Sequence, residues 1–203
     1  MSSIRCQGFI LDTFHLTPDT NVESMKKNIV VGVTGSVACY KALDVIRALR
    51  RFGASVEVVL TKEAEEFIRP VLFQSISGNK VVTSDLFKLT EGWDAAHISL
   101  AEKADLVLVA PATANIIGKV TAGICDDMLT CSICATKAPV LFAPAMNEGM
   151  YKNKIVQENI SKLKKAGYHF TGPTKGKLAC GSEGLGHIQD VEVIVKEVKR
   201  LLK

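Results

Sequence analysis

The sequence predicts a doubly wound parallel sheet of the α/β class, folded as one Rossmann-like or flavodoxin-like three-layer α/β/α domain. Short continuous apolar runs recur along the chain and are typical of parallel strands that are buried on both faces. Segments with apolar residues at helical spacing alternate with these runs, which favours helices packed on both sides of the sheet. The chain has 203 residues, of which 47% are hydrophobic and 23% charged, so one full core can form.

The first half of the chain alternates predicted strands and helices. The run 28–33 predicts the first strand, and a helix follows it until Phe52-Gly53. Further strands are expected at 56–60, 80–82 and 106–110. Further helices are expected from near Lys62, from Pro70 to the turn at 77–79, and from His97 to Ala104.

The second half continues the alternation. Pro111-Ala112-Thr113 turns into a helix, and a further helical stretch is expected at 128–135, before a strand at 140–143. A helix resumes near Asn153. The last helix carries apolar residues on one face from 191 to 202, and Asp190 is its predicted N-cap. Residues 172–177 resemble a phosphate-binding loop only superficially, because no strand-to-helix context surrounds them, and we expect a basic loop there.

Charge and composition limit the classes of partner. We expect residues 1–24 to be a loosely ordered N-terminal extension and residues 25–203 to be the domain. The net charge is +4, and the extension carries −2 (one Arg against two Asp and one Glu), so the domain carries +6. This charge suits an anionic small molecule, but the clustered basic stripe of a nucleic-acid binder is missing.

The same composition speaks against membranes and against a disulfide scaffold. No apolar run approaches the ~20 residues that a membrane span needs, and the first residues do not form a signal peptide. Six cysteines in a chain of this length fit a reducing compartment. We therefore expect a cytoplasmic protein.

Small hydroxyl and amide residues follow several of the predicted strands. The carboxyl ends of parallel strands meet at one edge of a sheet, and free N–H groups at helix starts are natural partners of a phosphate. Ordinary N-capping by these hydroxyl groups is the alternative, and the sequence leaves the two about even. NAD and nucleoside triphosphates are disfavoured, since neither glycine signature follows the first strand. The segments are Thr34-Gly35-Ser36-Val37, Thr61, Pro111-Ala112-Thr113-Ala114-Asn115 and Pro144-Ala145-Met146-Asn147.

One histidine and one cysteine are candidates for proton transfer. His97 opens a helix before the central strand, and we place it near the carboxyl edge, although a solvated histidine is the alternative. Cys180 lies among glycines with Lys177 nearby, so a packed core role is disfavoured. The pair Cys131-x-x-Cys134 suggests a redox or zinc motif, but it falls in an apolar helical stretch, and we expect buried thiols there.

Together these segments resemble the homo-oligomeric flavin-containing cysteine decarboxylases, and most closely the branch that acts on phosphopantothenoylcysteine. The resemblance runs from about Asn28 to Gly186. The motifs that carry it are Gly35-Ser36-Val37-Ala38, His97-Ile98-x-Leu100, Ala110-Pro111-Ala112-Thr113-Ala114-Asn115, Pro144-Ala145-Met146-Asn147-x-x-Met150 and Ala179-Cys180-Gly181. The last two of these motifs are the most specific.

The resemblance implies FMN as cofactor and a homotrimer, or a multiple of trimers, with sites between protomers. It implies His97 as the catalytic base and Cys180 as the proton donor. Asn147, Lys177, Leu178 and Ala179 would contact the substrate. The flavin would be held by Gly35, Ser36, Val37, Thr61, Thr113, Ala114 and Asn115, with Ala145 and Met146 near its ring system.

The resemblance also implies the reaction. An acylated cysteine has no electron sink for its carboxylate, and oxidation of its CH2–SH group to a thioaldehyde supplies one. Loss of CO2 then leaves an ene-thiol, and reduction gives the saturated thiol 4′-phosphopantetheine in coenzyme A biosynthesis. Because the reducing step needs an acid, Cys180 favours this complete reaction. The alternatives are a peptidyl-cysteine (lantibiotic-type) decarboxylase and a non-catalytic regulatory flavoprotein. For the complete reaction we expect a monofunctional decarboxylase, with the ligase on another chain.

Overall fold

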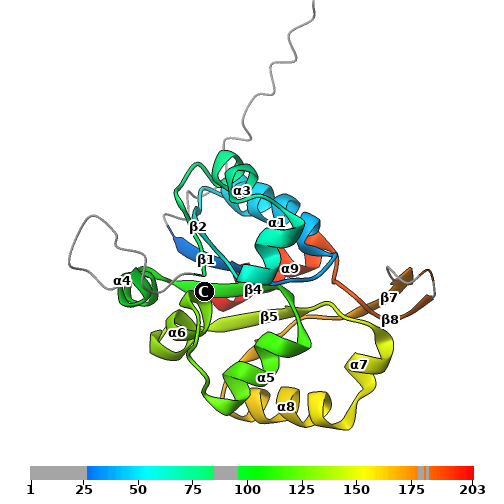
Figure 1. Ribbon diagram of the computed structural model, residues 1–203. Helices are drawn as coiled ribbons and strands as arrows, with labels where there is room; N and C mark the ends of the chain where they lie inside the picture. Colours follow the sequence, from blue (N-terminus) through cyan, green and yellow to red (C-terminus); the bar gives the residue numbers. More distant parts are fainter. Residues whose placement is uncertain (1–26, 85–95, 178–180, 182) are drawn as a thin grey trace, which may run out of the picture.

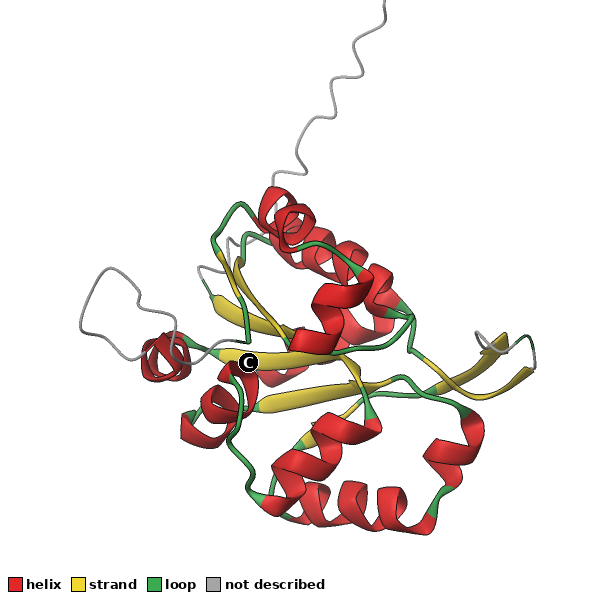
Figure 2. Cartoon of the chain, in the orientation of Figure 1, coloured by secondary structure: helices red, strands yellow, loops and turns green. Residues whose placement is uncertain are grey.

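The computed structural model describes residues 27–84, 96–177, 181 and 183–203, and its main feature is a six-stranded parallel sheet. The strand order is β3-β2-β1-β4-β5-β6, with helices on both faces (Figures 1 and 2). This confirms the predicted doubly wound α/β fold. The strands of this sheet are β1 (Asn28–Val33), β2 (Ser55–Leu60), β3 (Val81–Val82), β4 (Leu106–Ala112), β5 (Val140–Pro144) and β6 (His169–Phe170).

Nine helices occur in the described ranges, and most connect consecutive strands. Their starts and ends follow the predictions closely, apart from a short helix after β5 that the sequence pattern did not indicate. They are α1 (Cys39–Arg51), α2 (Lys62–Phe67), α3 (Pro70–Ser77), α4 (Ala96–Lys103), α5 (Ala114–Ala122), α6 (Met128–Ala135), α7 (Glu148–Lys152), α8 (Lys154–Lys165) and α9 (Val191–Leu201).

The sheet separates two apolar cores. Val31 of β1 faces α1 and α9, whereas its neighbour Val30 faces the layer of α5, α6 and α8. Every residue of β4 is buried, and burial of each Val or Leu side chain contributes about 1.5–3 kcal/mol. Gly32 has no side chain because Leu129 of α6 occupies the space that a Cβ would need. Apolar packing therefore fixes the strands, and their carboxyl ends are left to the loops.

The strand order places a topological switch between β1 and β4. β1 pairs with β2 on one side and with β4 on the other, and the chain leaves these strands towards opposite sides of the sheet. In open α/β sheets, ligands bind in the crevice outside the carboxyl ends at such a switch. The exits of β1 and β4 are therefore the first place to look for a site.

Two local predictions were wrong. Residues 172–177 were expected to form a loop, but Thr174–Lys177 is β7, which pairs antiparallel with β8 (Glu183–His187). This hairpin has no apolar run, because its ladder depends on pairing and not on burial. Asp190 is the N-cap residue of α9, but its side chain makes no capping hydrogen bond.

Two expectations concern membranes and the N-terminus. Within the described ranges, no helix has both the length and the apolar character that crossing a bilayer would demand. The predicted extension 1–24 lies outside the described residues, and the cytoplasmic location stays a prediction.

Candidate functional site

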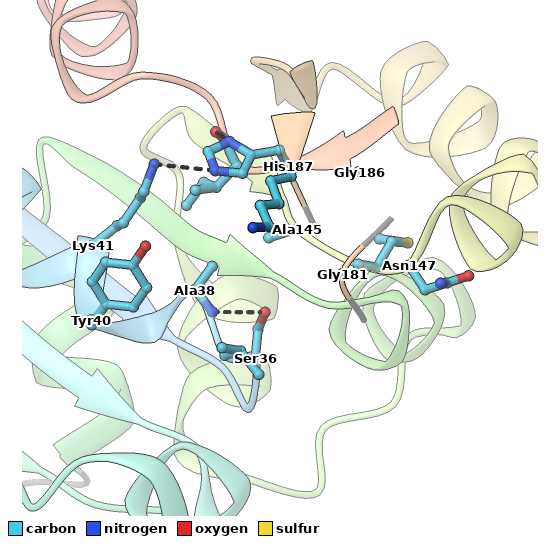
Figure 3. A pocket seen from close by; sticks show the side chains of 13 residues that line it. Ser36, Ala38, Tyr40, Lys41, Ala145, Asn147, Gly181, Gly186 and His187 are labelled. Atoms are coloured by element: carbon cyan, nitrogen blue, oxygen red, sulfur yellow. Dashed lines mark hydrogen bonds between the residues drawn. The ribbon is translucent and has the colours of Figure 1, made fainter. Parts of the chain in front are cut away.

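Two hollows lie at the carboxyl edge of the sheet. The larger has a volume of about 540 Å³, within the range of small-molecule sites, and we call it the hairpin cavity (Figure 3). The smaller, of about 210 Å³, we call the threonine hollow. The hairpin cavity is lined by Ser36, Val37, Ala38, Tyr40, Lys41, Ala145, Met146, Asn147, Lys177, Gly181, Gly186, His187 and Ile188. The threonine hollow is lined by Thr34, Gly35, Thr61, Glu63, Thr113, Asn115, Ile116, Asp127 and Met150.

Thr34 ties the two central strands together at the threonine hollow. Its Oγ1 donates a hydrogen bond of 2.7 Å to the carbonyl of Pro111 and accepts one of 3.1 Å from the N–H of Thr113. Thr113 in turn caps α5, because its side chain accepts from the N–H of Ile116 at 3.4 Å. The exits of β1 and β4 are therefore held at fixed separation by buried hydrogen bonds.

Thr61 contributes a hydroxyl group without a protein partner. It is the N-cap residue of α2 but makes no side-chain capping bond, and it is 5% exposed. Its Oγ1 is buried, and no hydrogen-bond partner occurs among the described residues. Since buried hydroxyl groups are nearly always bonded, this atom fits a hydrogen bond to a bound group. The alternative of ordinary capping therefore holds for Thr113 and fails for Thr61.

Two carboxylates also line the threonine hollow. Asp127 accepts a hydrogen bond of 2.8 Å from the N–H of Thr130, and its Oδ2 lies 3.3 Å from the Nζ of Lys119. Burial lowers the pKa of Lys119, but the nearby Asp126 and Asp127 outweigh it and raise that pKa overall. Asp127 thus shares the positive charge of Lys119 with Asp126. The start of α5 together with the Thr61 hydroxyl suits a hydroxyl-rich or anionic part of a cofactor.

The hairpin cavity is built where the hairpin meets the segment after β5. The N–H of Met146 donates to the carbonyl of Gly186 at 3.1 Å, and the N–H of Ala145 donates to Ala112 at 3.0 Å. A Cβ at Gly186, whose φ is +156°, would collide with the carbonyl oxygen of Met146. Only glycine allows β8 to approach this closely.

Glu148 fastens the hairpin from the other side. One carboxylate oxygen accepts from the N–H of Leu185 at 3.2 Å, and Lys152 lies 2.8 Å from it. The hydrogen bond from Lys152, followed by that from Leu185, lowers the pKa of Glu148. Asn147 caps α7, because its Oδ1 accepts from the N–H of Gly149 at 2.8 Å.

Several residues of the hairpin cavity were not predicted as site residues from the sequence, among them Lys41 and His187. The Nζ of Lys41 lies 3.4 Å from Nε2 of His187, and the Nδ1 of that ring lies 2.8 Å from the carbonyl oxygen of Ile188 (Figure 3). Lys41 is one helical turn beyond Ala38, so helical periodicity places it on the same side as the Ser36 turn. No local signal announces His187, because its partner is 146 positions away.

Most predicted site residues come together at this edge of the sheet. Ser36, Val37, Ala145, Met146, Asn147 and Lys177 line the hairpin cavity. Gly35, Thr61, Thr113 and Asn115 line the threonine hollow, and Ala114 begins α5 between two of them. Leu178, Ala179 and Cys180 lie outside the described residues. Their roles stay predictions, although Lys177 and Gly181 on either side of them line the hairpin cavity.

His97 is not brought to this edge in a single chain. It lies on α4, which leads into the amino end of β4, and Figure 1 shows α4 and the β7–β8 hairpin at opposite ends of the central strands. The prediction that His97 lies near the carboxyl edge is therefore wrong within one chain. The helix precedes β4, and the carboxyl edge lies at the other end of that strand.

The thiols of the Cys-x-x-Cys pair are less buried than predicted. Cys131 is half-buried and Cys134 exposed, because the apolar side of α6 is made by Leu129 and Ile133 instead. Burial and hydrogen bonds to Cys134 raise the pKa of the neighbouring Cys125 to about 11. In the described part of the chain, no cluster of His, Cys, Asp or Glu is arranged to hold a metal ion. Burial, followed by the charge of Asp127, also raises the pKa of Cys131, which disfavours a reactive thiolate at that position.

Comparison with known proteins connects this geometry to a family. The Flavoprotein family model matches residues 18–203. A Bacillus subtilis relative, "Coenzyme A biosynthesis bifunctional protein CoaBC", is 46% identical over 170 residues, which are 84% of this chain and 42% of the relative. The chain thus spans less than half of that bifunctional protein. A Streptococcus mutans relative, "Probable phosphopantothenoylcysteine decarboxylase", is 40% identical over 88% of this chain and 100% of its own length.

Several solved structures share this fold, including two that are named as FMN-dependent or FMN-binding proteins. A PPC decarboxylase variant complexed with pantothenoylaminoethenethiol has a TM-score of 0.77 and 29% identity, covering 86% of this chain and 97% of that one. The FMN binding protein AtHal3 has a TM-score of 0.74 and 30% identity, covering 86% and 96%. The FMN-dependent cysteine decarboxylase SpaF has a TM-score of 0.72 and 28% identity, covering 85% and 98%.

Proposed function

The chain belongs to the flavoprotein family, and we propose that it is an FMN-dependent carboxy-lyase that converts 4′-phosphopantothenoylcysteine to 4′-phosphopantetheine in coenzyme A biosynthesis. The observation that carries the proposal is the pair of adjoining hollows at the β1–β4 switch, one with an unpartnered buried hydroxyl and one with cationic walls. The Streptococcus mutans relative, whose whole length this chain covers, is named as a probable phosphopantothenoylcysteine decarboxylase, which supports the proposal.

The threonine hollow and the Ser36 turn would hold the flavin. The Thr61 hydroxyl would donate to it, and the start of α5 would face its anionic part. Ala145 and Met146 are held by backbone bonds to Ala112 and Gly186, so they present a fixed surface to the ring system. When bound, FMN supplies an acceptor for the hydride of the cysteine CH2–SH group and a donor for its return.

The residues of this chain would orient the substrate and move its protons. Asn147 would hold the carboxylate or amide end of the substrate. His97 would take the thiol proton as the CH2–SH carbon loses its hydride, so that a thioaldehyde forms and CO2 can leave. Cys180 would then protonate the carbon of the ene-thiolate as hydride returns to give the saturated thiol.

The position of α4 supports a site that two copies of the chain share. In one protomer His97 lies away from the hairpin cavity, because α4 leads into the amino end of β4 and the cavity lies at the carboxyl edge. We therefore propose a homotrimer, or a multiple of trimers, in which each cavity receives His97 from a neighbouring protomer. A closed ring of three repeats the same contact without leaving an unpaired surface.

A product assay with the purified protein tests the proposal. We expect a yellow protein that releases FMN on denaturation and that converts 4′-phosphopantothenoylcysteine to 4′-phosphopantetheine, identified by mass spectrometry. An oxidised ene-thiol from a peptide with a C-terminal cysteine would instead indicate a peptidyl-cysteine decarboxylase. Flavin binding without turnover of either substrate would indicate a non-catalytic regulatory flavoprotein. A protein that takes up no FMN would contradict both decarboxylase functions and the regulatory one.

A further inference from the structure

Lys41 and His187 lie together at one end of the hairpin cavity. Figure 3 shows Tyr40 and Lys41 at one side of the cavity, and Asn147 and Gly181 at the other. Its described lining contains Lys41, Lys177 and His187 but no Asp or Glu. A cavity with cationic groups and no carboxylate favours a ligand that carries negative charge.

The hydrogen bonds of His187 indicate which nitrogen of its ring carries the proton and which one accepts from Lys41. The Ile188 carbonyl can only accept, so the proton of the neutral ring lies on Nδ1, 2.8 Å from that oxygen. The ammonium of Lys41 can only donate, so Nε2 accepts from it at 3.4 Å. The ring therefore holds one N–H of Lys41 and leaves the other two available.

The hairpin fixes the ring in this position. A Cβ at Gly176 would lie 3.0 Å from Cγ of His187, so the absence of a side chain at Gly176 leaves room for the ring against β7. A histidine locked on both sides positions the lysine that it accepts from. Lys41 is half-buried on the first turn of α1, and its head group is directed into the cavity towards His187.

Lys41 is the cation of this end that lacks a counter-charge. Across the described part of the chain, no carboxylate lies within ion-pair distance of Lys41. Lys177 lies further along the hairpin, opposite Glu183 in the register of β7 and β8. The N-terminus of α1, which has no side-chain cap, adds its dipole on the same side, because Ser36 to Ala38 line the cavity too.

We infer that Lys41, positioned by His187, binds the phosphomonoester of the substrate. The inference rests on the proposed function and adds to it the subsite that selects phosphorylated over unphosphorylated pantothenoyl compounds. A phosphomonoester carries close to two negative charges at neutral pH and accepts several hydrogen bonds, so it suits the free donors of Lys41. With its phosphate at Lys41, the substrate extends along the cavity towards Asn147, where its reacting end is expected.

FMN also carries a phosphate of the same chemistry, so the phosphate proposed at Lys41 could come from the cofactor or from the substrate. The threonine hollow offers the Thr61 hydroxyl and the start of α5 for it, and neither belongs to the Lys41 end. These observations favour the substrate as the source of the phosphate at Lys41.

Binding of unreactive probes to the flavin-loaded protein tests this subsite without relying on turnover. 4′-Phosphopantothenate and pantothenate differ only in the phosphate, and isothermal titration gives their two dissociation constants. In wild type we expect the phosphorylated probe to bind roughly 10- to 100-fold more tightly. We expect Lys41→Met to lose most of this ratio, Lys41→Arg to keep much of it, and His187→Gln to give an intermediate ratio. Lys165→Met, on the exposed side of α8, is the matched control.

Three outcomes would overturn the inference. Equal binding of the two probes by wild type would show that the cavity has no phosphate subsite. A Lys41→Met variant that weakens both probes by the same factor would make Lys41 a structural residue. A variant that loses its preference for FMN over riboflavin, while keeping its preference for the phosphorylated probe, would assign Lys41 to the cofactor. Failure of the proposed function looks different, because the probe ratio would stand while no decarboxylated product forms.

Discussion

The two hollows at the carboxyl edge are built in contrasting ways. The threonine hollow is enclosed by the exits of β1, β2 and β4, which are central strands of the sheet, and Thr34 bonds two of these exits together. The hairpin cavity has one wall from the sheet and the other from β7 and β8, which pair only with each other. One hollow is thus continuous with the core, and the other depends on a separate hairpin.

This difference assigns different tasks to the two hollows. A site that is fixed by buried strands keeps its donors in place without a ligand, which suits a cofactor that stays bound. A hairpin that is attached by a few hydrogen bonds can open at low free energy and admit a substrate. We therefore expect substitutions in the threonine hollow to change flavin binding, and substitutions around the hairpin to change turnover.

The largest expected effect comes from a residue in neither hollow. His97→Asn should abolish decarboxylation and leave flavin bound, because it removes the base and lies on α4, remote from the hairpin cavity of its own chain. Co-expression of this variant with Asn147→Asp tests whether a neighbouring protomer supplies His97. Random assembly should restore about one quarter of wild-type activity, since only sites that take both intact residues work. No recovery, together with normal assembly, would place both residues in one protomer's site.

A change at Cys180, which lies between β7 and β8 in the sequence, should alter the product. Cys180→Ser should still release CO2, but it should accumulate the oxidised ene-thiol because the acid for the reducing step is missing. Mass spectrometry distinguishes this product from 4′-phosphopantetheine, and flavin content should equal that of wild type. Ordinary 4′-phosphopantetheine production by the variant would remove Cys180 from the mechanism.

The threonine hollow should respond in the opposite way. Thr61→Val removes only the unpartnered hydroxyl, so the flavin-free protein should be as stable as wild type or slightly more stable. We expect the dissociation constant of FMN to rise about tenfold or more, measured by quenching of flavin fluorescence. Thr121→Val is the control, because its Oγ1 bonds the carbonyl of Ile117 on α5. Equal FMN binding by Thr61→Val and wild type would contradict the assignment.

The smallest effect concerns the fastening of the hairpin. Glu148 has a lowered pKa in the folded protein, so its contribution is present above its ordinary pKa and is lost as the pH falls through the lowered value. In wild type, amide exchange of residues 174–187, corrected for intrinsic rates, should therefore rise a few-fold at most in acid. Glu148→Gln should show raised exchange already at neutral pH. Glu158→Gln, exposed on α8, should behave as wild type at both pH values.

The sequence by itself determined the parts of the site that are local. Apolar runs located β1, β2, β4 and β5, and their exits follow directly along the chain, so Ser36, Thr113 and Asn147 could be found without coordinates. Periodicity works here because a buried strand must be apolar on both faces, and because parallel strands bring their exits to one edge.

Only the tertiary structure decided the parts that depend on distant pairing. The hairpin of β7 and β8 has no hydrophobic pattern, since it is stabilised by its own ladder and by bonds to Met146 and Glu148. The contact of Lys41 with His187 joins residues 146 positions apart, and the separation of His97 from the cavity follows from which end of β4 its helix reaches. Sequence patterns report burial and local geometry, whereas these contacts depend on how the packed sheet brings distant segments together.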